Sequence, residues 1–102
     1  MSPRLIINPL AEEDLREAKA WHDDQRQGLG TEFIDEITLV FDRIIRSPMV
    51  HAIHFRGLRI ALARRFRYAV VYRLDDDQIT VVAIYHTSRH PRTWHVRSEP
   101  NG

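Results

Sequence analysis

Two clusters of basic and aromatic residues carry most of the chemistry open to this 102-residue sequence. The first runs from Arg64 to Tyr68, and the second runs from Tyr85 to Trp94. Arginine pairs bidentately with phosphate or carboxylate, and histidine or tyrosine can assist proton transfer from a ribose 2′-hydroxyl. The clusters therefore predict a site for RNA phosphates or for acidic residues of a protein partner. A solvated arginine-rich end, with Trp94 folded back over it, is the alternative without a function.

Other catalytic and metal sites find little support. Three and then four residues separate His86, His90 and His95, but Pro91 pushes His90 out of the helical conformation that would align them as ligands. The run from Asp75 to Asp77 is typical of a solvated turn. The sequence contains no cysteine, no glycine-rich phosphate loop and no serine-nucleophile elbow. We expect neither a metal nor a cofactor.

Charge is distributed unevenly, although the net charge is only +1. Residues 1–48 hold six basic and ten acidic side chains, a net charge of −4, whereas residues 49–102 hold nine arginines and four carboxylates, a net charge of +5. A fold that places these halves on different faces would present a basic face to phosphates or to an acidic partner. Lys19 is the only lysine among the fifteen basic residues.

Two helices are expected before the basic half. Asn8-Pro9 reads as an N-cap followed by proline at the first helical position, and an apolar stripe continues to about residue 26. Gly28-Leu29-Gly30 interrupts this stripe, Thr31 is a candidate cap for the second helix, and Arg46-Ser47-Pro48 ends it. Two helices joined by a short glycine-rich turn predict an antiparallel hairpin.

From residue 53 the apolar pattern changes to a period of two, which predicts strands. The alternating sets are Leu58, Ile60 and Leu62; Tyr68, Val70 and Tyr72; and Ile79, Val81, Ala83 and Tyr85, with a hairpin turn at Asp75–Gln78. With Leu5-Ile6-Ile7 as an N-terminal strand, the sequence predicts an α+β fold of order β-α-α-β-β-β, whose helices cover one face of a three-stranded antiparallel meander. Tyr68 and Tyr85 would then lie at the same end of the sheet and join the two basic clusters.

The length allows one domain over residues 1–102, with a core at about 4–86 and a polar C-terminal segment at 87–102. No apolar run approaches the roughly 20 residues of a membrane span. The N-terminus also lacks the features of a signal peptide. We therefore expect a cytoplasmic protein that has no membrane partner.

In order and spacing, residues 4 to 97 resemble the RelE/ParE toxin superfamily, and the pattern is closest to its ParE-like members. The matching residues are Pro9, Ala18, Trp21, Gly28-Leu29-Gly30, Phe33-Ile34-Asp35, Ser47-Pro48, His54, Gly57-x-Arg59, Arg65-Phe66-x-Tyr68-x-Val70-x-Tyr72 and His86-x-x-Arg89-x-Pro91-x-x-Trp94. The resemblance implies the toxin of a type II toxin–antitoxin system. It also implies a small antitoxin encoded beside the toxin, whose acidic segment would cover the basic half.

The superfamily divides by target. ParE members inhibit DNA gyrase and are not known as nucleases, whereas ribonuclease members bind the ribosomal A site and cut mRNA. This chain lacks the lysine cluster of the RelE type, since Lys19 lies in the first expected helix. The resemblance therefore favours gyrase as the target, with the ribosome and mRNA as the alternative. A non-toxic member and a DNA-binding domain are further alternatives, although both helices are acidic on their expected outer faces.

The candidate site residues follow from these alternatives. For a ribonuclease, the resemblance leaves five catalytic candidates: His54, Arg65, Tyr85, His86 and Arg89. For binding of the target or of the antitoxin, the candidates are Arg64, Arg65, Arg67, Tyr68, His86, Arg89, His90, Arg92 and Trp94.

Overall fold

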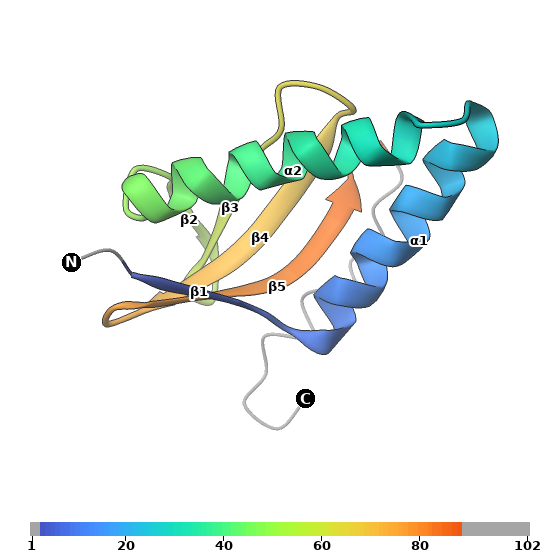
Figure 1. Cartoon of the computed structure of the whole chain (residues 1–102). Coiled ribbons are helices and arrows are strands. Elements are labelled where there is room, and N and C mark those ends of the chain that lie inside the picture. Colours follow the sequence, from blue (N-terminus) through green and yellow to red (C-terminus); the bar gives the residue numbers. More distant parts are fainter. Residues whose placement is uncertain (1–2, 89–102) are drawn as a thin grey trace.

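Seven elements make up residues 3–88, the part of the chain that the computed structural model describes (Figure 1). In chain order they are β1 (Arg4–Ile7), α1 (Pro9–Gln25), α2 (Leu29–Arg46), β2 (Ile53–Phe55), β3 (Leu58–Leu62), β4 (Tyr68–Asp75) and β5 (Gln78–His86). The strands form one sheet in the order β1-β5-β4-β3-β2, in which β1 is parallel to β5 and the other neighbours are antiparallel. The predicted α+β class is confirmed. The short strand β2 is an addition, because three residues are too few to display a period.

The two helices cover one face of the sheet (Figure 1). The apolar stripe predicted for α2 faces this sheet, and its residues are buried at intervals of three and four: Phe33, Ile37, Val40 and Ile44. They pack against inward-facing residues of β4 and β5, which include Val70, Tyr72, Ile79 and Val81. The helical hairpin is therefore held by the burial of one face of α2 rather than by contacts at its turn alone.

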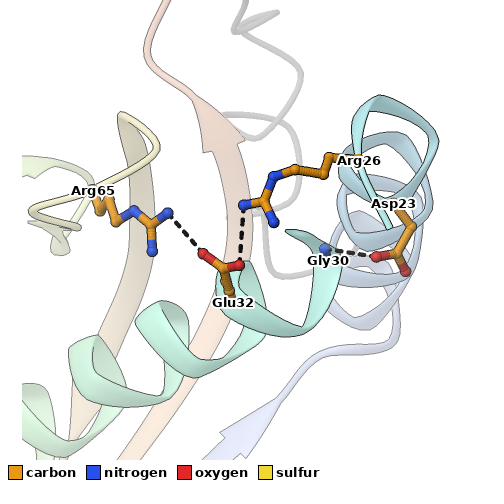
Figure 2. A network of polar contacts seen from close by, with 5 residues as sticks. All are labelled: Asp23, Arg26, Gly30, Glu32 and Arg65. Carbon is orange, nitrogen blue, oxygen red and sulfur yellow. Dashed lines mark hydrogen bonds and ion pairs between the residues drawn. The ribbon is translucent and has the colours of Figure 1, made fainter. Parts of the chain in front are cut away.

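The second helix begins earlier than its sequence suggests. The prediction of Thr31 as its cap is wrong, because the helix begins at Leu29 and Thr31 lies in the first turn. Gly28 turns the chain with a φ of 87°. The Asp23 carboxylate, at the end of α1, then accepts a hydrogen bond of 2.7 Å from the Gly30 amide (Figure 2). A Cβ on Gly30 would lie 2.6 Å from that carboxylate, so a larger residue here would have to displace the Asp23 side chain.

A β-bulge interrupts the pairing of β4 with β5. Val71 pairs with Ala83 and Tyr72 pairs with Val81, so Val82 is an extra residue in β5. Val81 belongs to the core beneath the helices, whereas Val82 and Ala83 both belong to a smaller cluster on the opposite face. Two successive residues of β5 thus point to the same face.

The bulge reverses the alternation that was expected along the rest of β5. The prediction that Ala83 and Tyr85 share a face with Val81 is wrong, because both pack with the cluster on the opposite face. Ile84 instead joins the core beneath the helices, and its amide donates a 3.0 Å hydrogen bond to the Asp14 carboxylate of α1. Within β5, Tyr85 and His86 are therefore presented in the reverse of their expected orientation.

Candidate functional site

The loop between β3 and β4 and the end of β5 lie together at one end of the sheet. Tyr68 pairs in register with His86, and their rings meet edge to face with centroids 5.3 Å apart. The Thr87 amide continues the ladder by donating a 2.9 Å hydrogen bond to the carbonyl of Arg67. We call this region the basic end and define it by Arg64, Arg65, Arg67, Tyr68 and His86.

Arg65 is held by the helical hairpin through an ion-pair network (Figure 2). Its guanidinium donates a 2.8 Å hydrogen bond to the Glu32 carboxylate, which also accepts one of 3.0 Å from Arg26. Both hydrogen bonds lower the pKa of the Glu32 carboxyl, and the bond from Arg65 contributes more than the bond from Arg26. The Arg65 amide donates to the Glu36 carboxylate at 3.0 Å. An anionic ligand of Arg65 would therefore compete with a carboxylate of the same chain.

The β3–β4 loop is also held by an aromatic cluster around the buried His22. The His22 imidazole stacks on Phe33 with centroids 4.8 Å apart, and Phe66 meets it edge to face at 5.0 Å. Phe66 and Arg67 both adopt the left-handed backbone conformation, with φ of 72° and 56°, which is costly for residues other than glycine. The partly buried Phe66 ring packs against the core and secures this turn, and Arg64 and Arg67 are exposed to solvent.

The structure does not bring all the ribonuclease candidates together. His54 lies on β2, three strands away from β5, and its level in the register corresponds to Thr80 and Val81 rather than to His86. Strand spacing and rise place His54 roughly 20 Å from His86. Tyr85 faces the opposite side of the sheet from Tyr68, the partner of His86. Burial raises the pKa of Tyr85, so its phenol stays protonated at neutral pH.

Four further candidates lie outside the described residues: Arg89, His90, Arg92 and Trp94. Among residues 3–88, no three histidine, aspartate or glutamate side chains gather closely enough to hold a metal ion. Over the same residues, the longest helices lack the run of apolar residues needed to cross a membrane.

Sequence reasoning missed a second polar cluster, which anchors the loop between α2 and β2. Tyr72 is fully buried, and its hydroxyl donates a 2.6 Å hydrogen bond to the Pro48 carbonyl. His51 Nδ1 lies 3.1 Å from the same hydroxyl oxygen. Arg59 donates hydrogen bonds of 2.6 and 3.3 Å to the carbonyls of His51 and Met49. The only signal in the sequence was the inward position of a tyrosine, whose hydroxyl needs a partner when buried.

These surroundings disfavour the charged form of His51. Burial lowers the pKa of the imidazole, and the positive charges of Arg43 and Arg59 lower it further. Burial likewise raises the pKa of Tyr72, so the pair is neutral near pH 7. A neutral, hydrogen-bonded pair is suited to holding the loop in one position.

His51 also borders an open groove of about 680 Å³ beside α2. Its charged and apolar lining includes Glu36, Leu39, Arg43, Arg46, Val50 and Arg64. We call it the α2 groove. It opens near the basic end through Arg64 and continues along α2 to its last turn.

Comparisons with known proteins agree with these features. A sequence model described as the ParE toxin of the type II toxin–antitoxin system parDE matches residues 5–91. Toxin ParE2 of Mycobacterium tuberculosis is 33% identical over 106 residues, which cover 100% of this chain and 96% of that protein.

Solved structures share the fold at lower sequence identity. The chromosomal ParDE system from P. aeruginosa superposes with a TM-score of 0.74 at 13% identity, covering 83% of this chain and 96% of that one. A double mutant of the E. coli toxin RelE in the free state gives a TM-score of 0.62 at 19% identity, covering 82% of each chain. Together, the family match and the full-length relative show that this chain belongs to the ParE toxin family of type II toxin–antitoxin systems.

Proposed function

We propose that this ParE-family toxin acts by binding and inhibiting DNA gyrase, that it is not a nuclease, and that a small antitoxin encoded beside it neutralises it. The observation that carries the proposal is the dispersal of the ribonuclease candidates within the described residues. His54 is roughly 20 Å from His86, and Tyr85 faces away from Tyr68. General acid–base catalysis needs its groups within hydrogen-bond reach of one reacting proton, and His54 and Tyr85 are not placed in this way around His86.

The basic end is instead suited to binding a macromolecular surface. Its loop is fixed by the Phe66 ring and by the carboxylates of Glu32 and Glu36, so little conformational entropy is lost on association. Within this loop, Arg64 and Arg67 are exposed to solvent, and their guanidinium groups can pair with acidic residues of a protein target.

Gyrase supercoiling with purified toxin tests the proposal. We expect inhibition at micromolar toxin, weakened about 10-fold or more by Arg67→Glu, because charge reversal at an interface adds repulsion to the loss of attraction. Arg4→Glu, an exposed arginine on β1, is the matched control and should inhibit like the wild type. Unchanged supercoiling with well-folded wild-type protein would refute gyrase as the target.

Toe-printing on translating ribosomes separates the ribonuclease alternative. We expect no cleavage of mRNA at any codon. Cuts in the A site that disappear in folded His86→Ala protein would replace the gyrase proposal with RNA cleavage. Co-expression with the product of the adjacent reading frame should restore growth, and failure of both rescue and co-purification would contradict the antitoxin.

A further inference from the structure

The α2 groove holds more positive charge than the described residues neutralise. Arg43, Arg46 and Arg64 line it against the single carboxylate of Glu36, a net charge of +2. That carboxylate already accepts a hydrogen bond from the Arg65 amide. The ion pairs formed within residues 3–88 involve other basic side chains. The three groove arginines are therefore available to an anion from outside the chain.

The dipole of α2 offsets only part of this positive charge. Arg43 and Arg46 lie in the last turn of the helix, where the dipole is equivalent to about half of one negative charge. The groove thus stays electropositive. The titration of His51 agrees: burial lowers the pKa of its imidazole, and the positive charges of Arg43 and Arg59 lower it further. An electropositive hollow attracts anions, and a guanidinium pairs bidentately with phosphate.

The groove arginines also retain hydrogen-bond donors for a ligand. Arg43 donates a 3.0 Å hydrogen bond to the Leu62 carbonyl, and Arg46 donates one of 3.4 Å from its Nε to the Asp42 carbonyl. Each guanidinium has five N–H donors, so both keep terminal N–H groups beyond these bonds. Arg64 lies on the β3–β4 loop, so the cations border the groove from two different elements.

His51 adds a hydrogen-bond acceptor to this set of donors. The Tyr72 hydroxyl has a single hydrogen, which it donates to the Pro48 carbonyl at 2.6 Å. The 3.1 Å contact between His51 Nδ1 and the same hydroxyl is therefore a bond donated by Nδ1–H. Since the pKa of His51 is lowered, the imidazole is neutral near pH 7 and keeps a lone pair on Nε2. A ligand hydroxyl can donate to this nitrogen.

Apolar side chains and a fixed loop complete the groove. Leu39 is 57% exposed and Val50 is 71% exposed, and both line the groove, where they can pack against a planar ring. The volume of about 680 Å³ lies within the roughly 300–1,000 Å³ of small-molecule sites. Hydrogen bonds from Tyr72 and Arg59 hold the loop that carries Val50 and His51. Little ordering of this loop is therefore needed when a ligand binds.

We propose that the α2 groove is a binding site for a ribonucleoside phosphate. The phosphates pair with the three groove arginines, a ribose hydroxyl donates to His51 Nε2, and the base packs on Leu39 and Val50. Inorganic phosphate lacks the ring that the apolar residues would cover, and a sugar phosphate lacks it as well. The inference goes beyond the proposed function and depends neither on gyrase nor on the antitoxin.

Isothermal titration calorimetry of the full-length toxin with ADP tests the site. We expect ADP to bind at one site, and Arg46→Gln to weaken binding about 10-fold, because it removes a charged donor to phosphate. Arg4→Gln, an exposed arginine on β1, is the matched control and should bind ADP like the wild type. Pyrophosphate, which carries the phosphates without ribose or base, should bind more weakly than ADP.

A second pair of ligands tests the role of His51. 2′,3′-Dideoxy-ADP lacks the ribose hydroxyls, so it should bind the wild type about 5-fold more weakly than ADP. In His51→Phe, with its fold checked by circular dichroism, the two nucleotides should bind with equal affinity. Equal affinities in the wild type would overturn the assignment of the ribose hydroxyl to His51.

Other outcomes would overturn the inference as a whole. Absence of ADP binding to folded wild-type protein would refute it, and equal affinities for pyrophosphate and ADP would show that the groove accepts phosphate alone. Loss of ADP binding in Arg67→Gln but not in Arg46→Gln would place the phosphates on the basic end. Duplex DNA that binds through Arg46 more tightly than ADP would assign the arginines to a nucleic-acid backbone.

Gyrase inhibition separates this inference from the proposed function. Arg46→Gln should inhibit supercoiling like the wild type, because Arg46 lies in the α2 groove and outside the basic end. Wild-type protein that binds ADP as expected but leaves supercoiling unchanged would refute the gyrase proposal and support the nucleotide site.

Discussion

Replacing Tyr72 by phenylalanine should destabilise the protein, although it removes only one oxygen atom. The hydroxyl is fully buried and takes part in two hydrogen bonds, one to the Pro48 carbonyl at 2.6 Å and one with His51 at 3.1 Å. A hydrogen bond of this kind contributes about 0.5–1.5 kcal/mol to stability, and a buried group left unpaired costs about 1–3 kcal/mol. Because Pro48 is only partly buried, water can replace part of the loss. We expect the free energy of unfolding to fall by about 2 kcal/mol.

Urea unfolding followed by far-UV circular dichroism measures this change. The midpoint should fall while the dependence of the unfolding free energy on urea concentration stays constant, because the surface exposed on unfolding is unchanged. Thr38→Val is the control, since it also deletes a hydroxyl that donates to a backbone carbonyl, but from the exposed face of α2. Its effect should stay within about 0.5 kcal/mol.

Hydrogen exchange adds a local readout. The Val50 amide donates a 3.2 Å hydrogen bond to the Ser47 carbonyl inside the anchored loop. In Tyr72→Phe this amide should exchange faster by more than global destabilisation explains, because the loop loses an anchor. Equal effects of Tyr72→Phe and Thr38→Val on stability, with unchanged exchange at Val50, would refute the anchoring role.

Three further predictions follow from other contacts. Gly30→Ala should lower the free energy of unfolding in urea by about 1–2 kcal/mol, although alanine has the higher helix propensity. The reason is that the alanine Cβ would displace the Asp23 carboxylate that caps α2. A gain in stability would contradict this prediction. Glu32→Gln should change stability little in urea unfolding, because both ion pairs are exposed to solvent, but it should speed tryptic cleavage after Arg65. Unchanged cleavage would show that the network does not restrain the loop. The pKa of His51 lies below its ordinary value of 6.5, so the contribution of the neutral imidazole to stability is complete above pH 6.5 and is lost as the pH falls below it. In urea titrations at pH values below 6.5, the wild type should therefore lose stability relative to His51→Gln. Parallel pH profiles of the two proteins would contradict the assignment.

The local elements follow from residue patterns that act over short distances. α1 begins at Pro9 with Asn8 as its N-cap, as predicted, and α2 buries the stripe that its spacing of three and four indicates. The meander follows from alternation and from the turn at Asp76-Asp77. Since hairpin neighbours must pair, the meeting of Tyr68 with the end of β5 also follows from the order of the strands.

Three features of the fold were beyond such reasoning. A carboxylate seven residues away, that of Asp23, caps α2 in place of Thr31, and its arrival depends on how the hairpin turn folds. The bulge at Val82 breaks a period that the sequence shows as regular, and it separates Tyr85 from the face expected for it. The pairing of Arg65 with Glu32 joins positions 33 residues apart.

For this protein, the sequence by itself determined the order of the elements apart from β2, the basic second half and the resemblance to the ParE family. Beyond the meeting of Tyr68 with the end of β5, the tertiary structure decided which chemical groups meet. It separated His54 from His86, neutralised Arg65 with Glu32, and built a groove whose border includes His51, a residue that the sequence did not single out. The physical reason is that periodicity and capping act within a few residues, whereas a site depends on contacts between segments that only the packed core brings together.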